Sequence, residues 1–144
     1  MIKAALFDLD GVVFETESQY TIFWGMIGRE YHPEMPDFAH RIKGQTLVQI
    51  YDKYFSDAQT FAHIEGFTSV AEEQAKITVR LDEYERNMAY NYVAGFEDFV
   101  KDLKKNGVKC AVVTSSNANK MSIVYECHPE FKTYFDKVLT SEDF

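Results

Sequence analysis

The chain has 144 residues, of which 46% are hydrophobic and 15% aromatic. This content is enough for a packed core, so the sequence predicts a globular protein and not a disordered one. The net charge of −8 argues against nucleic acid or an anionic membrane as a main partner, because both would be repelled. The apolar run after Met1 is too short for a signal peptide, and no stretch could span a membrane. We therefore expect a cytoplasmic protein.

The first predicted element is a strand at AALF, residues 4–7. Consecutive apolar residues are typical of a strand covered on both faces, as in a parallel sheet. Asp8 and Asp10 follow directly, and Gly11 lets the backbone turn sharply after them. Residues two apart on an extended chain point the same way, so both carboxylates can face one crevice. That crevice would lie at the carboxyl end of the strand, where open α/β sheets bind ligands.

The next part of the chain, residues 16–92, is predicted to be mainly helical. Three helix starts carry the capping-box pattern, a hydroxyl residue followed three positions later by Gln or Glu: Thr16 with Gln19, Thr46 with Gln49, and Ser69 with Glu72. Apolar residues recur at helical spacing after each of these starts. The segment HPEMPDF contains two of the three prolines and predicts a loop.

From residue 93 the pattern changes to alternating helices and strands. An amphipathic helix begins at Phe96 and ends before Gly107, and the segment VKCAVVTSS predicts a second buried strand that ends in hydroxyl residues. A helix at about 117–126 and a third strand at FDKVLT follow. We therefore predict an α/β core formed by residues 1–15 and 93–144, which a helical insertion at 16–92 interrupts.

The aspartate pair and Thr114 carry the predicted chemistry. Two carboxylates this close repel each other, which a divalent cation or a reaction would relieve. One could act as a nucleophile and the other as a general acid/base. Thr114 ends the second strand, and a hydroxyl beside the free N–H groups of a helix N-terminus forms an anion site. Together these residues predict a phosphate group held between two strand ends.

Two segments of the sequence resemble a known family. FDLDGVVFETE, residues 7–17, resembles motif I of the haloacid dehalogenase-like phosphohydrolases, and VVTSSN, residues 112–117, resembles their motif II. The helical insertion resembles the cap of the β-phosphoglucomutase-like subgroup. The segment VAGFEDFVKDLKKNGVKCAVVTSS, residues 93–116, also resembles the stretch that leads into motif II there, although Ala94 replaces the usual proline. The resemblance implies an α/β fold with a Rossmann-like parallel-sheet core and an inserted helical cap domain.

The resemblance also implies roles for the matching residues. Asp8 would attack phosphorus to form an aspartyl-phosphate, and Asp10 would act as the general acid/base. Thr114, with Ser115 and Asn117, would hold the phosphoryl group. Asp8 and the main-chain carbonyl of Asp10 would bind Mg²⁺, a cation that prefers oxygen ligands. The implied substrate is a small phosphorylated metabolite.

Further residues of the insertion and its entry are candidates for substrate contact. The segment RIKGQT resembles the specificity loop of the subgroup, so Arg41 or Lys43 could bind an anionic part of the substrate, or be solvated charges. Glu15 replaces the usual Asp or Asn and could contact the metal's waters or a substrate hydroxyl, or simply line the hinge. Tyr20 stands where the sugar-phosphate mutases have a histidine, which favours hydrolysis over the alternative mutase activity.

The resemblance also indicates an incomplete core. The family's lysine motif and second acidic pair are expected beyond residue 144, and Glu142 and Asp143 could in principle reach the site in their place. Strands are predicted on only one side of the first strand, so we expect an unpaired sheet edge that permits self-association. A catalytically incomplete fragment that serves as a binding or structural module is therefore a second alternative. A phospho-acceptor receiver domain is disfavoured, because its first acidic pair would precede a short helix and a strand.

Overall fold

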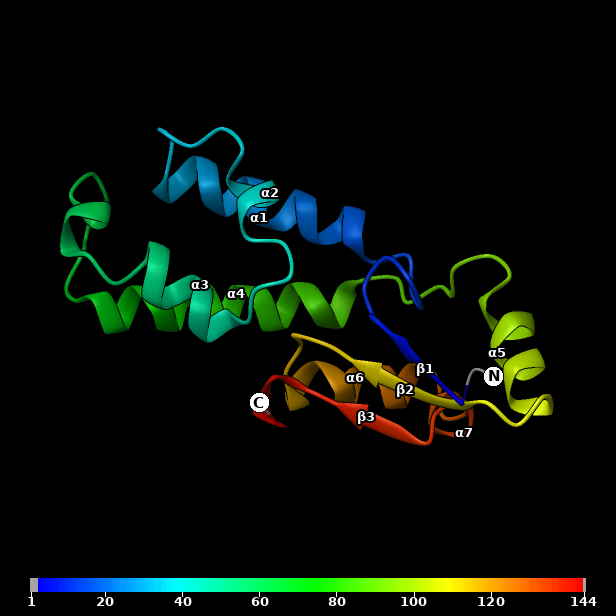
Figure 1. The fold of residues 1–144 in the computed structure, drawn as a ribbon. Helices are drawn as coiled ribbons and strands as arrows, with labels where there is room; N and C mark the ends of the chain where they lie inside the picture. The colour runs from blue at the N-terminus through cyan, green and yellow to red at the C-terminus, as the bar shows by residue number, and fades with distance from the viewer. Residues whose placement is uncertain (1–2, 144) are drawn as a thin grey trace. The chain divides into compact units, whose positions relative to one another are not determined.

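The computed structural model describes residues 3–143, which form two compact units (Figure 1). The α/β unit contains the residues up to Ser18 and those from Met88 onward, and the helical unit spans Gln19–Asn87. The helical unit therefore begins three residues later and ends five residues earlier than the predicted insertion at 16–92. Its role as a cap stays a prediction.

The α/β unit is built on a parallel sheet of the order β1-β2-β3. Its strands are β1 (Ala4–Phe7), β2 (Lys109–Val113) and β3 (Lys137–Leu139). β3 is shorter than predicted. Just before it, Asp136 binds the β2 main chain at Cys110, where its N–H donates to the Cys110 carbonyl at 2.7 Å and its carboxylate accepts from the Cys110 N–H at 2.8 Å. The predicted α/β fold class is confirmed.

The two faces of this sheet differ in how well they are covered. Phe7 and Val112 are opposite each other in the register and are both buried on one face. The Phe7 ring packs edge-on against Phe96, at 5.7 Å between ring centroids, and against Phe135, at 5.9 Å. The elements that accompany the sheet are α5 (Phe96–Lys105), α6 (Ala118–Cys127), α7 (Phe131–Tyr134) and the 3-10 turn η2 (Ser141–Asp143).

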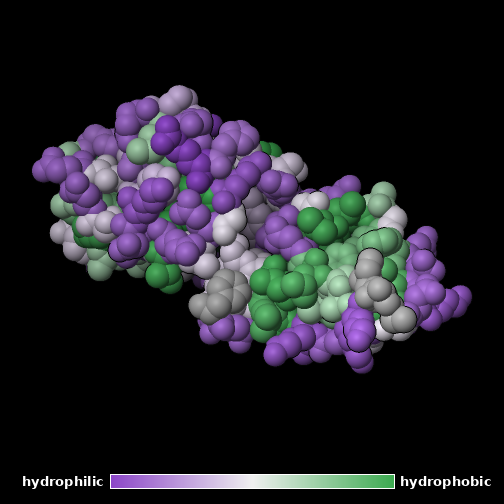
Figure 2. All heavy atoms as spheres, viewed as in Figure 1, coloured by the Kyte–Doolittle hydropathy of each residue, from purple (hydrophilic) through white to green (hydrophobic). Residues whose placement is uncertain are grey.

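The other face of the sheet is open. Leu6 points to this face and is 73% exposed, and Figure 2 shows an apolar area over the strands. Within residues 3–143, β1 pairs only with β2, so its outer edge is unpaired. The expectation of a first strand covered on both faces is therefore wrong, whereas the expected unpaired edge is observed.

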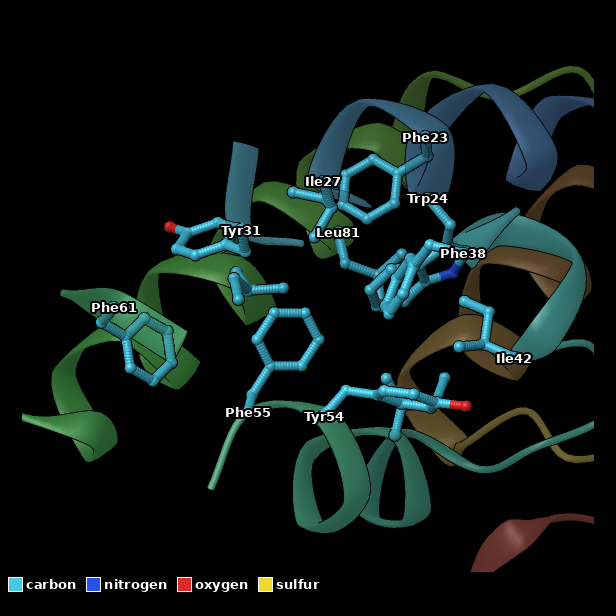
Figure 3. Packing of buried hydrophobic residues seen from close by; sticks show 12 residues of the cluster. Phe23, Trp24, Ile27, Tyr31, Phe38, Ile42, Tyr54, Phe55, Phe61 and Leu81 are labelled. Carbon is cyan, nitrogen blue, oxygen red and sulfur yellow. The ribbon is translucent and has the colours of Figure 1, made fainter. Parts of the chain in front are cut away.

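The helical unit closes around a core of its own (Figure 3). It contains α1 (Glu17–Tyr31) apart from its first two residues, α2 (Phe38–Arg41), α3 (Leu47–Tyr54), the 3-10 turn η1 (Ala58–Phe61) and α4 (Val70–Asn87). The capping box of Thr46 and Gln49 is formed in both directions, as predicted. None of the described helices is long and apolar enough to cross a membrane.

One short helix of this unit falls partly in a predicted loop. α2 begins at Phe38, whose side chain is 1% exposed and packs against Tyr54 and Phe55 in the aromatic core (Figure 3). Gly28 of α1 makes room for it, because a Cβ at Gly28 would lie 2.8 Å from the Phe38 Cβ. The prolines of HPEMPDF predict the loop correctly, but burial of Phe38 decides where the chain becomes helical again.

Candidate functional site

The aspartate pair lies in a tight turn directly after β1. The Gly11 N–H donates to the Phe14 carbonyl at 2.8 Å, and the Val13 N–H donates to the Leu9 carbonyl at 2.9 Å. Gly11 has a φ of +81°, and a Cβ there would lie 2.5 Å from a carboxylate oxygen of Glu17. A side chain at position 11 would therefore be strained, which gives the glycine of this motif a local structural reason.

Asp8 is the more exposed aspartate of the pair. Its Oδ1 accepts a hydrogen bond from the Leu9 N–H at 2.8 Å. Partial loss of water around the carboxyl raises the pKa of Asp8, and the negative charge of Asp10 adds to the rise. The Leu9 hydrogen bond and the positive charge of Lys120 oppose this shift in the pKa. Asp8 is thus a carboxylate with few protein partners, which suits a nucleophile.

Asp10 is instead held firmly by two side chains. The Lys120 Nζ lies 2.5 Å from its Oδ1 and 2.7 Å from its Oδ2, and the Thr16 hydroxyl donates to Oδ1. The Lys120 side chain is only 2% exposed, compared with 23% for that of Asp10. The two aspartates therefore share a turn but have different environments, which is how paired carboxylates come to have different roles.

Lys120 was not predicted as a site residue. It lies in the first turn of α6, one turn before the buried Val124, on the face that packs inward. A lysine at a buried helix position needs a charged partner. The place of Lys120 in the helical pattern was therefore the sequence signal that this residue has such a partner. The partner itself could not be inferred, because Asp10 lies 110 residues earlier in the chain.

The predicted phosphate-binding residues follow β2 at the same end of the sheet. Thr114 is 2% exposed and its hydroxyl oxygen accepts from the Ser116 N–H at 3.1 Å. Ser115 is partly buried. The Asn117 side chain accepts from the Lys120 N–H at 3.1 Å and so caps α6. The structure thus gives Asn117 a capping role, and its predicted contact with phosphate stays a prediction.

Glu142 and Asp143 contact main-chain groups near the site. Glu142 accepts a hydrogen bond from the Ala118 N–H at 3.0 Å, in the first turn of α6. Asp143 accepts from the Thr140 N–H at 2.8 Å, directly after β3. In these positions they stabilise a helix start and a turn, which does not support the idea that they replace the second acidic pair.

The oxygen groups of the turn fit a magnesium ion in kind but not in number. The Asp8 carboxylate and the Asp10 main-chain carbonyl are hard ligands of the type that Mg²⁺ prefers. Across residues 3–143, however, no group of three or more metal-ligating side chains comes together. The described residues therefore offer only part of the octahedral set that Mg²⁺ requires.

The remaining candidates lie outside this turn. Glu15 is exposed, and its N–H donates to the Asn91 carbonyl at 2.8 Å, which joins the two chain segments that lead into and out of the helical unit. Arg41 forms an exposed ion pair with Asp37 at 2.9 Å, one helical turn earlier. Lys43 is exposed in the same unit. Because Arg41 and Lys43 belong to the helical unit, their contact with a substrate stays a prediction.

Carboxylates and a hydroxyl at the carboxyl ends of adjacent parallel strands define an α/β protein with a site suited to an anion such as phosphate. The family model described as haloacid dehalogenase-like hydrolase matches residues 5–144. The chain belongs to this family of enzymes, as motifs I and II indicated. A comparison with proteins of curated function gives no significant match.

Solved structures show the same fold. A provisionally assigned β-phosphoglucomutase from Bacteroides vulgatus superposes with a TM-score of 0.69 at 21% identity, over 99% of this chain and 56% of that one. The β-phosphoglucomutase of Clostridium difficile gives 0.64 at 21%, over 100% and 64%. CbbY of Rhodobacter sphaeroides, crystallised with phosphate, gives 0.60 at 20%, over 100% and 65%. The chain thus spans 56–65% of the length of these three structures.

Proposed function

We propose that this chain carries the nucleophile and the acid/base of a Mg²⁺-dependent phosphohydrolase that acts on a small phosphorylated metabolite. The observation that carries the proposal is the unequal pair, in which Asp8 is exposed with a main-chain N–H as partner and Asp10 is held by Lys120 and Thr16. A reaction that needs both a nucleophile and a proton-transfer group requires this difference. The cytoplasmic setting is part of the proposal and rests on the sequence alone.

The proposed reaction has two steps. In the first, an Asp8 oxygen forms a bond to phosphorus while the bond to the leaving oxygen breaks, and Asp10 gives that oxygen a proton. In the second, water attacks the aspartyl-phosphate, Asp10 takes the water's proton, and Asp8 is released together with inorganic phosphate. The Thr114 hydroxyl would bind the phosphoryl oxygens. Mg²⁺, held by Asp8 and the Asp10 carbonyl, would supply positive charge beside the transferred group.

The test replaces the nucleophile with a side chain of the same shape. In a polypeptide that also carries the family's lysine and second acidic pair, Asp8→Asn should reduce hydrolysis of p-nitrophenyl phosphate to background, while circular dichroism stays unchanged. The matched control is Asp98→Asn in the first turn of α5, which should keep wild-type turnover. Turnover by Asp8→Asn near the wild-type rate would show that Asp8 is not the nucleophile.

Hydrolysis is favoured over sugar-phosphate mutation by the partner of Tyr20. The Tyr20 hydroxyl donates to Glu85 at 2.5 Å within the helical unit, and Glu85 is 5% exposed. A phenol is a much weaker acid than an imidazolium, so it does not exchange protons near neutral pH as an imidazole does. Interconversion of hexose 1- and 6-phosphates faster than phosphate release would contradict this choice.

A further inference from the structure

A buried lysine holds the carboxylate to which the proposed function assigns proton transfer. The Lys120 ammonium contacts both Asp10 oxygens, at 2.5 and 2.7 Å, and its side chain is almost fully buried. A buried ammonium is retained only when it is well paired, because its transfer out of water costs free energy that an exposed ammonium does not lose. The Asn117 cap fixes the N-terminus of α6 on which Lys120 lies. The position of the ammonium is therefore set by the fold.

The contacts on Asp10 are divided unequally between its two oxygens. Oδ1 accepts from the Thr16 hydroxyl and from Lys120, whereas Oδ2 accepts from Lys120. Each carboxylate oxygen can accept about two hydrogen bonds. Oδ2 is thus the oxygen with more capacity left for a proton or a water molecule.

The same contacts oppose coordination of a cation by this carboxylate. Asp8 and Asp10 are two residues apart, and two free carboxylates at that spacing would both be attracted to one divalent ion. The Lys120 ammonium repels such an ion and already contacts both Asp10 oxygens. A cation at Oδ2 would lie beside the ammonium, so this part-buried ion pair would have to weaken before the Asp10 side chain could become a metal ligand.

We propose that Lys120 is a positioning residue that keeps the Asp10 carboxylate out of the metal's coordination sphere, so that only the Asp10 main-chain carbonyl remains for the cation. This role rests on the proposed function of the aspartate pair. In this role Lys120 keeps the functions of the two aspartates separate. Asp8 is the metal ligand and nucleophile, and Asp10 is the proton-transfer group. Lys120 acts through Asp10 and needs no contact with the substrate.

The test measures cation affinity and needs no turnover. Mn²⁺ is titrated into the purified 144-residue chain, and free Mn²⁺ is followed by electron paramagnetic resonance. Lys120→Met, which keeps the length but removes the charge, should bind Mn²⁺ about tenfold more tightly or better, because a carboxylate ligand is gained. The control Lys105→Met, at an exposed position in α5, should match wild type. The double variant Lys120→Met/Asp10→Asn should lose the gain.

Unchanged or weaker Mn²⁺ binding by folded Lys120→Met would overturn the proposal. If Lys120→Met does not fold, Lys120→Gln is titrated in its place with the same expectation. If neither folds, the double variant decides. A folded double variant supports the ion pair as the reason for the buried lysine, and an unfolded one shows that Lys120 is a packing residue and overturns the role. Failure of the Asp8→Asn test would leave the Mn²⁺ result intact, so the two proposals fail separately.

Discussion

The two units of this chain differ in how completely each closes its own structure. In the helical unit, twelve residues form a continuous buried cluster, and Phe55 at its centre packs against Tyr31, Phe38 and Phe61. In the α/β unit, one sheet face is covered while Leu6 on the other is 73% exposed. The same unit carries a site whose described residues offer only part of a metal's ligands. Within residues 3–143 the helical unit thus closes its core, whereas the sheet of the α/β unit is covered on one face.

The largest expected effect concerns turnover at the site in the α/β unit. We expect the purified 144-residue chain to hydrolyse p-nitrophenyl phosphate no faster than background and to bind Mg²⁺ no better than about millimolar, because few ligands are present. Loss of one preorganised electrostatic partner typically costs about 10²–10³ in rate. Among the described residues no cluster of ligating side chains completes the metal site, and the nearby Lys120 is paired with Asp10. A chromogenic assay with and without Mg²⁺ measures this, and clear turnover by sequence-verified protein would refute it.

A smaller effect should separate the two cores by stability. Phe55→Ala removes a fully buried ring, so we expect it to lower the free energy of unfolding by about 3–5 kcal/mol. Phe99→Ala, at a position that is 55% exposed in the α/β unit, should cost about 1 kcal/mol or less. Urea unfolding followed by Trp24 fluorescence reports the helical unit, and circular dichroism reports both. Equal losses for the two variants would remove the contrast between the closed and the open core.

The smallest expected effect concerns association through the open sheet. The unpaired edge and exposed face of β1 should let copies of the chain associate, as exposed strands invite pairing. Leu6→Glu should shift the protein toward monomer in sedimentation velocity experiments, with little change in unfolding. Val48→Glu is the matched control, because Val48 is 77% exposed in the helical unit and Leu6 is 73% exposed. Edge pairing is a weak contact, so we expect association at a protein concentration of about 100 μM. Wild-type protein that stays monomeric at that concentration would contradict the prediction.

Much of the organisation followed from local patterns in the sequence. The Thr46–Gln49 box formed as predicted because both partners lie within one helical turn. The turn at Gly11 and the position of the aspartates after β1 depend on neighbouring residues and were equally predictable. The short helices α2 and α7 were not predicted. Each has only four residues, too few to show a helical period, and buries the aromatic residue at its start, Phe38 or Phe131.

The tripeptide His-Pro-Glu occurs twice and shows which contacts depend on neighbouring residues and which depend on the fold. In both copies the histidine Nδ1 contacts the glutamate two residues later, at 2.8 Å for His32 and 3.1 Å for His128. The other ring nitrogen lies 2.5 Å from a main-chain carbonyl in both, that of Tyr54 for His32 and that of Tyr90 for His128. The first contact spans two residues and follows from the sequence. The second joins segments 22 and 38 residues apart and depends on the fold.

The same distinction holds for the site. The sequence by itself determined that Asp8 and Asp10 end a strand, that Thr114 ends another and that a helical insertion lies between them, because each of these features is written in consecutive residues. Only the tertiary structure decided that Lys120 and Thr16 hold Asp10 while Asp8 stays exposed. It also decided that Glu142 accepts a hydrogen bond from the Ala118 N–H in the first turn of α6. The physical reason is that a side-chain charge finds its partner in space, and the chain separation between Lys120 and Asp10 leaves no periodic trace in the sequence.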